Sequence, residues 1–92
     1  MTLSKTGNAK NNQSALLLSH STIWRAIDRL ASQNELTASG LAKLAGLDAT
    51  TFNPSRRTTL EGKNRWPSTE TISKILQVTG TGPDEFVELL RD

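Results

Sequence analysis

Positively charged side chains, which are the groups that bind phosphate and other anions, gather in residues 49–66. This segment has a net charge of +3, whereas the whole chain of 92 residues has a formal net charge of +2 at pH 7. Guanidinium and ammonium groups are suited to phosphate recognition. A charged run is also typical of a solvated loop, so composition alone leaves both interpretations open. The basic residues of the segment are Arg56, Arg57, Lys63 and Arg65, against the single acid Glu61.

Residue types that carry catalysis or bind metals are scarce. The chain has no cysteine and a single histidine, His20, so it lacks the residues for a thiol nucleophile or for a site with several histidine or thiolate ligands. There is no Gly-rich phosphate loop and no pair of carboxylates in an apolar setting, and most serines and threonines are explained as helix caps. We therefore expect no enzymatic activity, no cofactor, no metal and no evident small-molecule site.

The length is suited to one small domain preceded by a polar extension. Residues 1–18 show no periodicity and predict a disordered N-terminal segment, and residues 19–92 predict the folded domain. The alternative for the extension is a basic arm along a nucleic-acid backbone, carried by Lys5 and Lys10. No apolar run approaches the roughly 20 residues that a membrane span needs, and ALLL at 15–18 is too short for a secretory signal. We expect no membrane partner and a cytoplasmic location.

Apolar periodicity predicts helices and no strand. Apolar residues recur every three or four positions between residues 21 and 34, which predicts a helix. Its expected cap is Ser21 or Thr22, and its expected end is Asn34. A second amphipathic pattern follows the cap Ser68, and a last short helix begins at Pro83, a favoured first-turn residue. With two short helices between residues 37 and 57, the sequence predicts an all-α fold of five helices.

The first of these two short helices is bounded by recognisable start and stop residues. Either Thr37 or Ser39 can cap it, and Gly46 is expected to end it, since glycine readily takes the left-handed conformation found after helices. The packing surface is expected to consist of Leu41, Ala42, Leu44 and Ala45.

The segment GLDATTFNPSRR, residues 46–57, contains a proline where the next helix should continue. Asp48 is a suitable N-cap, and Phe52 is the one large apolar anchor. Proline removes a backbone hydrogen bond and clashes with the preceding turn, at a cost of about 3 kcal/mol in a helix interior. Asn53 can serve as a new cap before Pro54. We predict a short helix over 49–52 or 49–53 and then a kink or separate turn at 54–57.

Two stretches resemble the phage-repressor helix-turn-helix family, which includes lambda repressor and Cro and is also called XRE. They are SGLAKLAGLDATTF at 39–52 and WPSTETISKILQVTGTGPDEFVELL at 66–90. The resemblance covers roughly residues 21–90 and implies a compact five-helix lambda-repressor-like domain. The basic spacer before RWPSTE also resembles bacterial repressors with a LexA-like self-cleaving peptidase, whose catalytic residues would lie beyond residue 92.

This resemblance implies sequence-specific binding of double-stranded DNA by a transcriptional regulator, a repressor acting as a homodimer. In the family, the start of the third helix enters the major groove. Carried over to this sequence, the base-reading residues are Ala49, Thr50, Thr51 and Asn53. The residues to which phosphate contacts are assigned are Ser39, Ser55, Arg56, Arg57, Lys63 and Arg65. For Ser39, helix capping is the alternative role.

A protein-interaction module, antitoxin-like or an adaptor, is the alternative function, because the same fold can exist without reading DNA. The last helix combines Phe86, Val87 and Leu90 with Glu85 and Glu88, and it can complete the core, bind a partner or do both. The +3 segment discriminates between the two functions. A DNA-binding protein needs positive charge beside its reading segment, whereas a protein-binding one does not.

Overall fold

The computed structural model describes residues 18–91, and this part of the chain is helical. Four α-helices are present in it: α1 (His20–Gln33), α2 (Ala38–Leu44), α3 (Thr69–Thr79) and α4 (Pro83–Leu89). A one-turn 3-10 helix, η3 (Pro54–Arg56), lies between α2 and α3. The all-α prediction is confirmed. The prediction of five helices is wrong, because residues 49–52 form turns instead of a helix. The extension predicted at 1–18 lies, except for Leu18, outside the described residues.

Side-chain caps define where the helices begin. Ser19 Oγ accepts from the backbone N–H of Thr22 at 3.2 Å, and Thr22 Oγ1 accepts from the Ser19 N–H at 2.9 Å. This reciprocal pair begins α1 ahead of the caps predicted at residues 21 and 22. Thr37 Oγ1 accepts from the Gly40 N–H at 2.9 Å and therefore caps α2 in place of Ser39. Ser68 caps α3 as predicted.

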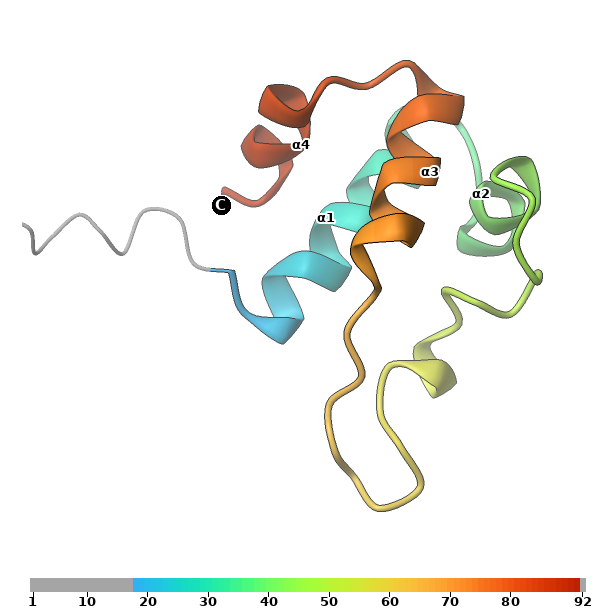
Figure 1. The fold of residues 1–92 in the computed structure, drawn as a ribbon, viewed down its shortest axis with the longest axis vertical. Helices are drawn as coiled ribbons and strands as arrows, with labels where there is room; N and C mark the ends of the chain where they lie inside the picture. Colours follow the sequence, from blue (N-terminus) through green and yellow to red (C-terminus); the bar gives the residue numbers. More distant parts are fainter. Residues whose placement is uncertain (1–17, 92) are drawn as a thin grey trace, which may run out of the picture.

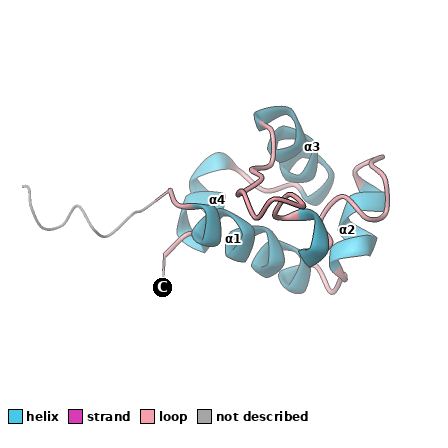
Figure 2. Ribbon diagram, turned by 90° about the horizontal axis from the view of Figure 1, so that it is seen from below, coloured by secondary structure: helices cyan, strands magenta, loops and turns pink. Residues whose placement is uncertain are grey.

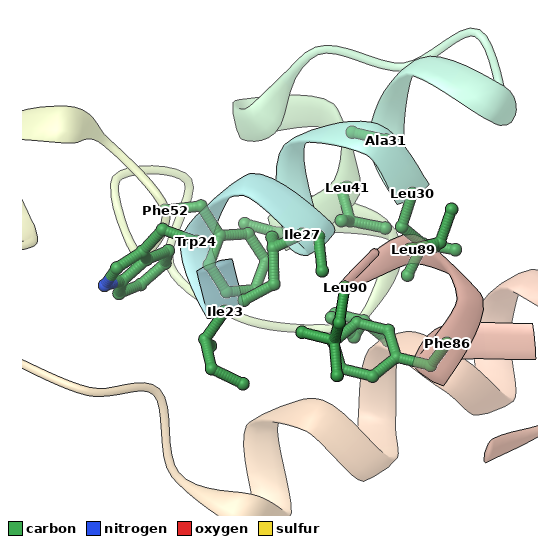
Figure 3. Packing of buried hydrophobic residues seen from close by; sticks show 13 residues of the cluster. Ile23, Trp24, Ile27, Leu30, Ala31, Leu41, Phe52, Phe86, Leu89 and Leu90 are labelled. Carbon is green, nitrogen blue, oxygen red and sulfur yellow. The ribbon is translucent and has the colours of Figure 1, made fainter. Parts of the chain in front are cut away.

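The core is built around α1, which contacts both α4 and α2, while α2 also contacts α3 (Figures 1 and 2). Figure 3 shows Ile27 of α1 between Trp24 and Phe52 on one side and the side chains of α4 on the other. Trp24 belongs to this core, since it is 5% exposed. Leu44 was expected to pack, but it is 52% exposed. The fully buried side chains of largest volume are Phe52, Ile27, Leu30, Leu41 and Ile75.

Two arginines of α1 hold the C-terminal end of α4. Arg29 Nη1 donates to the Leu89 carbonyl at 3.0 Å and also to the Arg91 carbonyl, and Arg25 Nη2 donates to the Leu90 carbonyl at 3.3 Å. The last carbonyls of a helix have no partner within it and carry the negative end of its dipole. These arginines therefore fasten α4 to α1.

Replacing Arg29 with alanine is expected to lower the free energy of unfolding by about 1–2 kcal/mol, because two carbonyls lose a charged donor. Lys74→Ala is the matched control. Its Nζ pairs with Glu70 at 3.7 Å on the surface of α3, and such pairs contribute about 0.5 kcal/mol or less. Urea denaturation of both variants measures the difference, and equal losses would contradict the anchoring role of Arg29.

Candidate functional site

The stretch from Asp48 to Asn53 consists of two overlapping turns. The Thr51 N–H donates to the Asp48 carbonyl and the Asn53 N–H donates to the Thr50 carbonyl, each at 3.0 Å. Both are bonds between residues three apart, whereas an α-helix needs bonds between residues four apart. The short helix predicted over 49–52 or 49–53 is therefore wrong. Asp48 still acts as a cap, since its Oδ1 accepts from the Thr50 N–H at 2.8 Å and from the Thr50 hydroxyl.

Pro54 causes the break that follows. It forces Asn53 into an extended conformation, with φ −61° and ψ 139°, as the residue before a proline commonly is. A new turn, η3, then begins at Pro54, with the Arg56 N–H donating to the Asn53 carbonyl at 2.8 Å. Of the two alternatives predicted at 54–57, a kink or a separate turn, the separate turn is confirmed. Asn53 occupies the cap position, but its side chain makes no capping hydrogen bond.

Thr50 also sets the protonation of Asp48. The pKa of Asp48 is lowered first by the hydrogen bond from the Thr50 hydroxyl, then by the bond from the Thr50 N–H, with a smaller contribution from the Arg56 guanidinium. A folded-state pKa below the usual value means that the carboxylate stabilises the turn at pH values above the ordinary 3.8. This contribution is lost as the pH falls through the folded-state pKa.

Thr50→Val is expected to raise the pKa of Asp48 towards 3.8, because valine keeps the shape of threonine but loses its hydroxyl donor. A carboxyl carbon titration by NMR measures the shift directly. Thr69→Val, an exposed position at the start of α3, is the control and should leave Asp48 unchanged. An unaltered Asp48 titration in Thr50→Val would show that the hydroxyl does not hold the carboxylate.

Phe52 fixes this stretch to the core. Its side chain is fully buried, and its ring meets Trp24 edge-on at 6.2 Å between centroids (Figure 3). The Phe52 carbonyl accepts two hydrogen bonds from Arg57, at 2.7 Å from Nη2 and 3.2 Å from Nε. The end of the turn segment is therefore held by both its side chain and its backbone.

Arg57 links the same segment to α1. Its Nη1 and Nη2 donate to the two carboxylate oxygens of Asp28 at 2.9 and 2.8 Å, and its Cζ lies 4.7 Å from the Trp24 ring centroid. The Arg57 side chain is 16% exposed. The guanidinium is held by Asp28 and the Phe52 carbonyl, so the phosphate contact predicted for Arg57 competes with these bonds and stays a prediction. Sequence spacing carried no signal for a pair 29 residues apart.

The Arg57 backbone closes the loop that follows. The Arg57 carbonyl accepts from the Arg65 N–H at 3.0 Å and from His20 Nε2 at 2.7 Å. Trp24 Nε1 donates to the Arg65 carbonyl at 3.0 Å. The loop that connects Arg57 to Pro67 is mostly exposed, including all of residues 60–66. Its two ends are pinned side by side against the start of α1.

Most of the other predicted site residues are brought to one stretch of surface. Thr50 and Asn53 are exposed, and Ala49 and Thr51 are half-buried. Arg56 Nη1 donates to Thr50 Oγ1 at 3.2 Å, which places a cation beside a proposed reading side chain. The remaining exposed residues of the predicted phosphate set are Ser55, Lys63, Arg65 and, on α2, Ser39.

A cleft of about 260 Å³ lies between the turn segment and the start of α3. Arg56 and Arg65 both line it, together with Thr51 and the 54% exposed Trp66. The sequence predicted roles for the two arginines but none for Trp66. The only signal for Trp66 in the sequence was its position directly before the Pro-Ser start of a helix. The fold thus assembles two cations from opposite ends of the basic segment.

Comparison with family models, with curated proteins and with solved structures finds no match to this chain. Within residues 18–91, no helix is long and apolar enough to cross a membrane. The same residues contain no group of three or more histidine or acidic side chains that could hold a metal ion.

Proposed function

We propose that this chain binds double-stranded DNA sequence-specifically and acts as a transcriptional repressor. The order of α2, the turn at Gly46 and the segment 48–53 is compatible with a helix-turn-helix in which the second helix is reduced to turns. One observation carries the proposal. The polar side chains of Thr50 and Asn53 are exposed on a segment anchored by Phe52, and Arg56 lies directly beside them.

The proposed reading surface consists of Ala49, Thr50, Thr51 and Asn53. The Asn53 amide can form two hydrogen bonds to an adenine edge, and the threonine side chains offer a hydroxyl and a methyl group to a base pair in the major groove. The Arg57 anchor and the Asp48 cap hold this surface in place before DNA arrives. Such preorganisation reduces the entropy lost on binding.

The proposed phosphate contacts are Arg56, Lys63 and Arg65, with the hydroxyls of Ser39 and Ser55. Contacts of this kind position a protein on the duplex without reading its sequence. The exposed acids of α4, Asp84, Glu85 and Glu88, would repel phosphates and orient that helix away from DNA. A homodimer, with two copies on a palindromic site, completes the proposal.

A site selection from random duplexes, followed by fluorescence anisotropy at several salt concentrations, tests the function. Three basic side chains in contact with phosphates predict that the logarithm of the DNA association constant falls against the logarithm of the salt concentration with a slope near −2.7 per protomer. Recovery of a palindromic consensus supports the homodimer. Absence of duplex binding at low salt, or affinity that is indifferent to salt, would refute DNA binding.

A protein-interaction module is the second candidate, and a groove of about 420 Å³ between α3 and the start of α4 favours it. Ile72, Leu76 and Pro83 line this groove with mostly apolar surface. Such a surface can accept a partner segment or a second copy of the chain. If the chain binds no DNA, Leu76→Asp and size-exclusion chromatography would test for a partner at this groove.

A further inference from the structure

The loop from Arg57 to Arg65, here called the 57–65 hairpin, is a hydrogen-bonded structure that extends away from the helices (Figure 1). Thr58 and Asn64 form an antiparallel bridge, the Thr59 N–H donates to the Lys63 carbonyl at 2.8 Å, and the Arg65 N–H closes the base. At the tip, Gly62 has a φ of 83°, which a side chain would disfavour. These hydrogen bonds tie the two sides of the hairpin together up to its tip.

Leu60 stands at this tip with a relative exposure of 108%. Thr59 Oγ1 accepts from the backbone N–H groups of Glu61 at 3.2 Å and Lys63 at 3.1 Å, so the turn is tied together beneath the leucine. Single exposed leucines are ordinary on protein surfaces. A leucine held fully exposed at the end of a hydrogen-bonded hairpin is instead placed to enter a partner.

The charge around Leu60 indicates what that partner is. Lys63, Arg65 and Arg56 are exposed near the hairpin or at its base, and Glu61 is the only acid in it. A partner must therefore be anionic and must also accept an apolar side chain. The minor groove of duplex DNA meets both needs, because apolar side chains can insert between base steps there while cations contact the flanking phosphates.

The reach of the hairpin agrees with this partner. The three steps from Arg57 to Leu60, at roughly 3.3 Å per residue in extended chain, span about 10 Å. The minor groove is about 7.5 Å deep. A hairpin whose base lies at the phosphate backbone can thus bring Leu60 to the base edges, with Arg56 and Arg65 near the strand that separates the two grooves.

We propose that the 57–65 hairpin enters the minor groove next to the major-groove site of residues 49–53, and that Leu60 contacts the base pairs there and bends the duplex. This inference rests on the proposed DNA binding. The inference predicts that the protein also discriminates among base pairs outside the major-groove contact, because the shape and deformability of the minor groove depend on their sequence.

The test uses the full chain, a selected duplex, and the variants Leu60→Ala and Val78→Ala. Val78 is a 40% exposed residue on α3 and serves as the control. Thermal unfolding of Leu60→Ala should match the unsubstituted protein, since Leu60 packs against nothing. Its DNA affinity should fall about tenfold or more, as expected for losing a buried leucine side chain, and Val78→Ala should bind normally.

Two further measurements report on the minor groove itself. Replacing flanking G·C pairs by inosine·cytosine removes only the minor-groove amino group of guanine, so this change should alter binding of the unsubstituted protein but not of Leu60→Ala. End-to-end energy transfer should show a bend of roughly 20–90° that Leu60→Ala loses.

The outcomes separate this inference from the proposed function. Salt-dependent DNA binding that is unchanged in Leu60→Ala and insensitive to inosine would overturn the hairpin inference and leave DNA binding intact. Failure of the unsubstituted protein to bind any duplex would overturn both. Leu60-dependent binding to phosphatidylserine vesicles, without an inosine effect on DNA, would assign the hairpin to membranes and also overturn the inference.

Discussion

Phe52→Ala is expected to lower the free energy of unfolding by about 3–5 kcal/mol, the range for truncating a buried phenylalanine to alanine. Small domains of this size are stable by about 5–15 kcal/mol, so the variant should be close to unfolding. The reason is structural. Phe52 is fully buried and contacts Trp24, and it anchors the segment proposed to read DNA.

The measurement is denaturant unfolding followed by circular dichroism. Trp66→Ala is the control, because it also removes a large aromatic ring but from a side chain that is 54% exposed. It should destabilise the domain by less than Phe52→Ala. Comparable losses in the two variants would mean that the turn segment is not anchored through Phe52.

Arg57→Gln is expected to separate stability from charge in DNA binding. Loss of the paired bonds to Asp28, of the bonds to the Phe52 carbonyl and of the contact with Trp24 should lower the free energy of unfolding by about 1.5–3 kcal/mol. DNA affinity should fall because the turn segment loses its tie to α1. The salt slope should not change, since the Arg57 guanidinium is paired with Asp28.

Arg65→Gln is the matched comparison. Arg65 is exposed and its loss should leave stability nearly unchanged, while the salt slope should decrease in magnitude by about 0.9. Arg57→Lys should not restore the unsubstituted behaviour, because an ammonium group cannot form the paired bonds to Asp28. A salt slope that falls in Arg57→Gln while stability holds would show that Arg57 contacts phosphate after all.

A double-mutant cycle with Asp28→Asn isolates the pair. The side chain of Asp28 is 49% exposed and that of Arg57 is 16% exposed, so water solvates the carboxylate more than the guanidinium. We expect a coupling free energy of about 0.5–1.5 kcal/mol, within the range for contacting residues. A coupling near zero would assign the effect of Arg57 to Phe52 and Trp24 alone.

Local rules account for the features that the sequence predicted correctly. Ser68 begins α3 because its hydroxyl accepts from the N–H of Thr71, which has no partner within the helix. Pro54 interrupts the chain because its ring and missing N–H act on its immediate neighbours. The burial of Phe52 follows from an isolated aromatic residue in a polar stretch. The helix cap and the effect of proline operate over four residues or fewer.

The same local rules were insufficient for residues 49–52 and for Leu44. The pattern predicted a helix after Asp48, but only four residues lie between that cap and the extended Asn53. This stretch is too short to offset the cost of starting a helix, so turns form instead. Leu44 has helical spacing relative to Leu41, yet it is 52% exposed. The packing of α2 against its neighbours decides which side of so short a helix is covered.

The sequence by itself determined the helical class, most helix boundaries, the break at Pro54 and the concentration of basic residues in 49–66, because composition and short-range sterics specify them. Only the tertiary structure decided which of those basic residues stay available. Arg57 is adjacent in sequence to Arg56, but it lies against Asp28 and Trp24 of α1, whereas Arg56 faces solvent. Contacts between residues about 30 positions apart depend on how the helices pack, and no spacing rule along the chain encodes them.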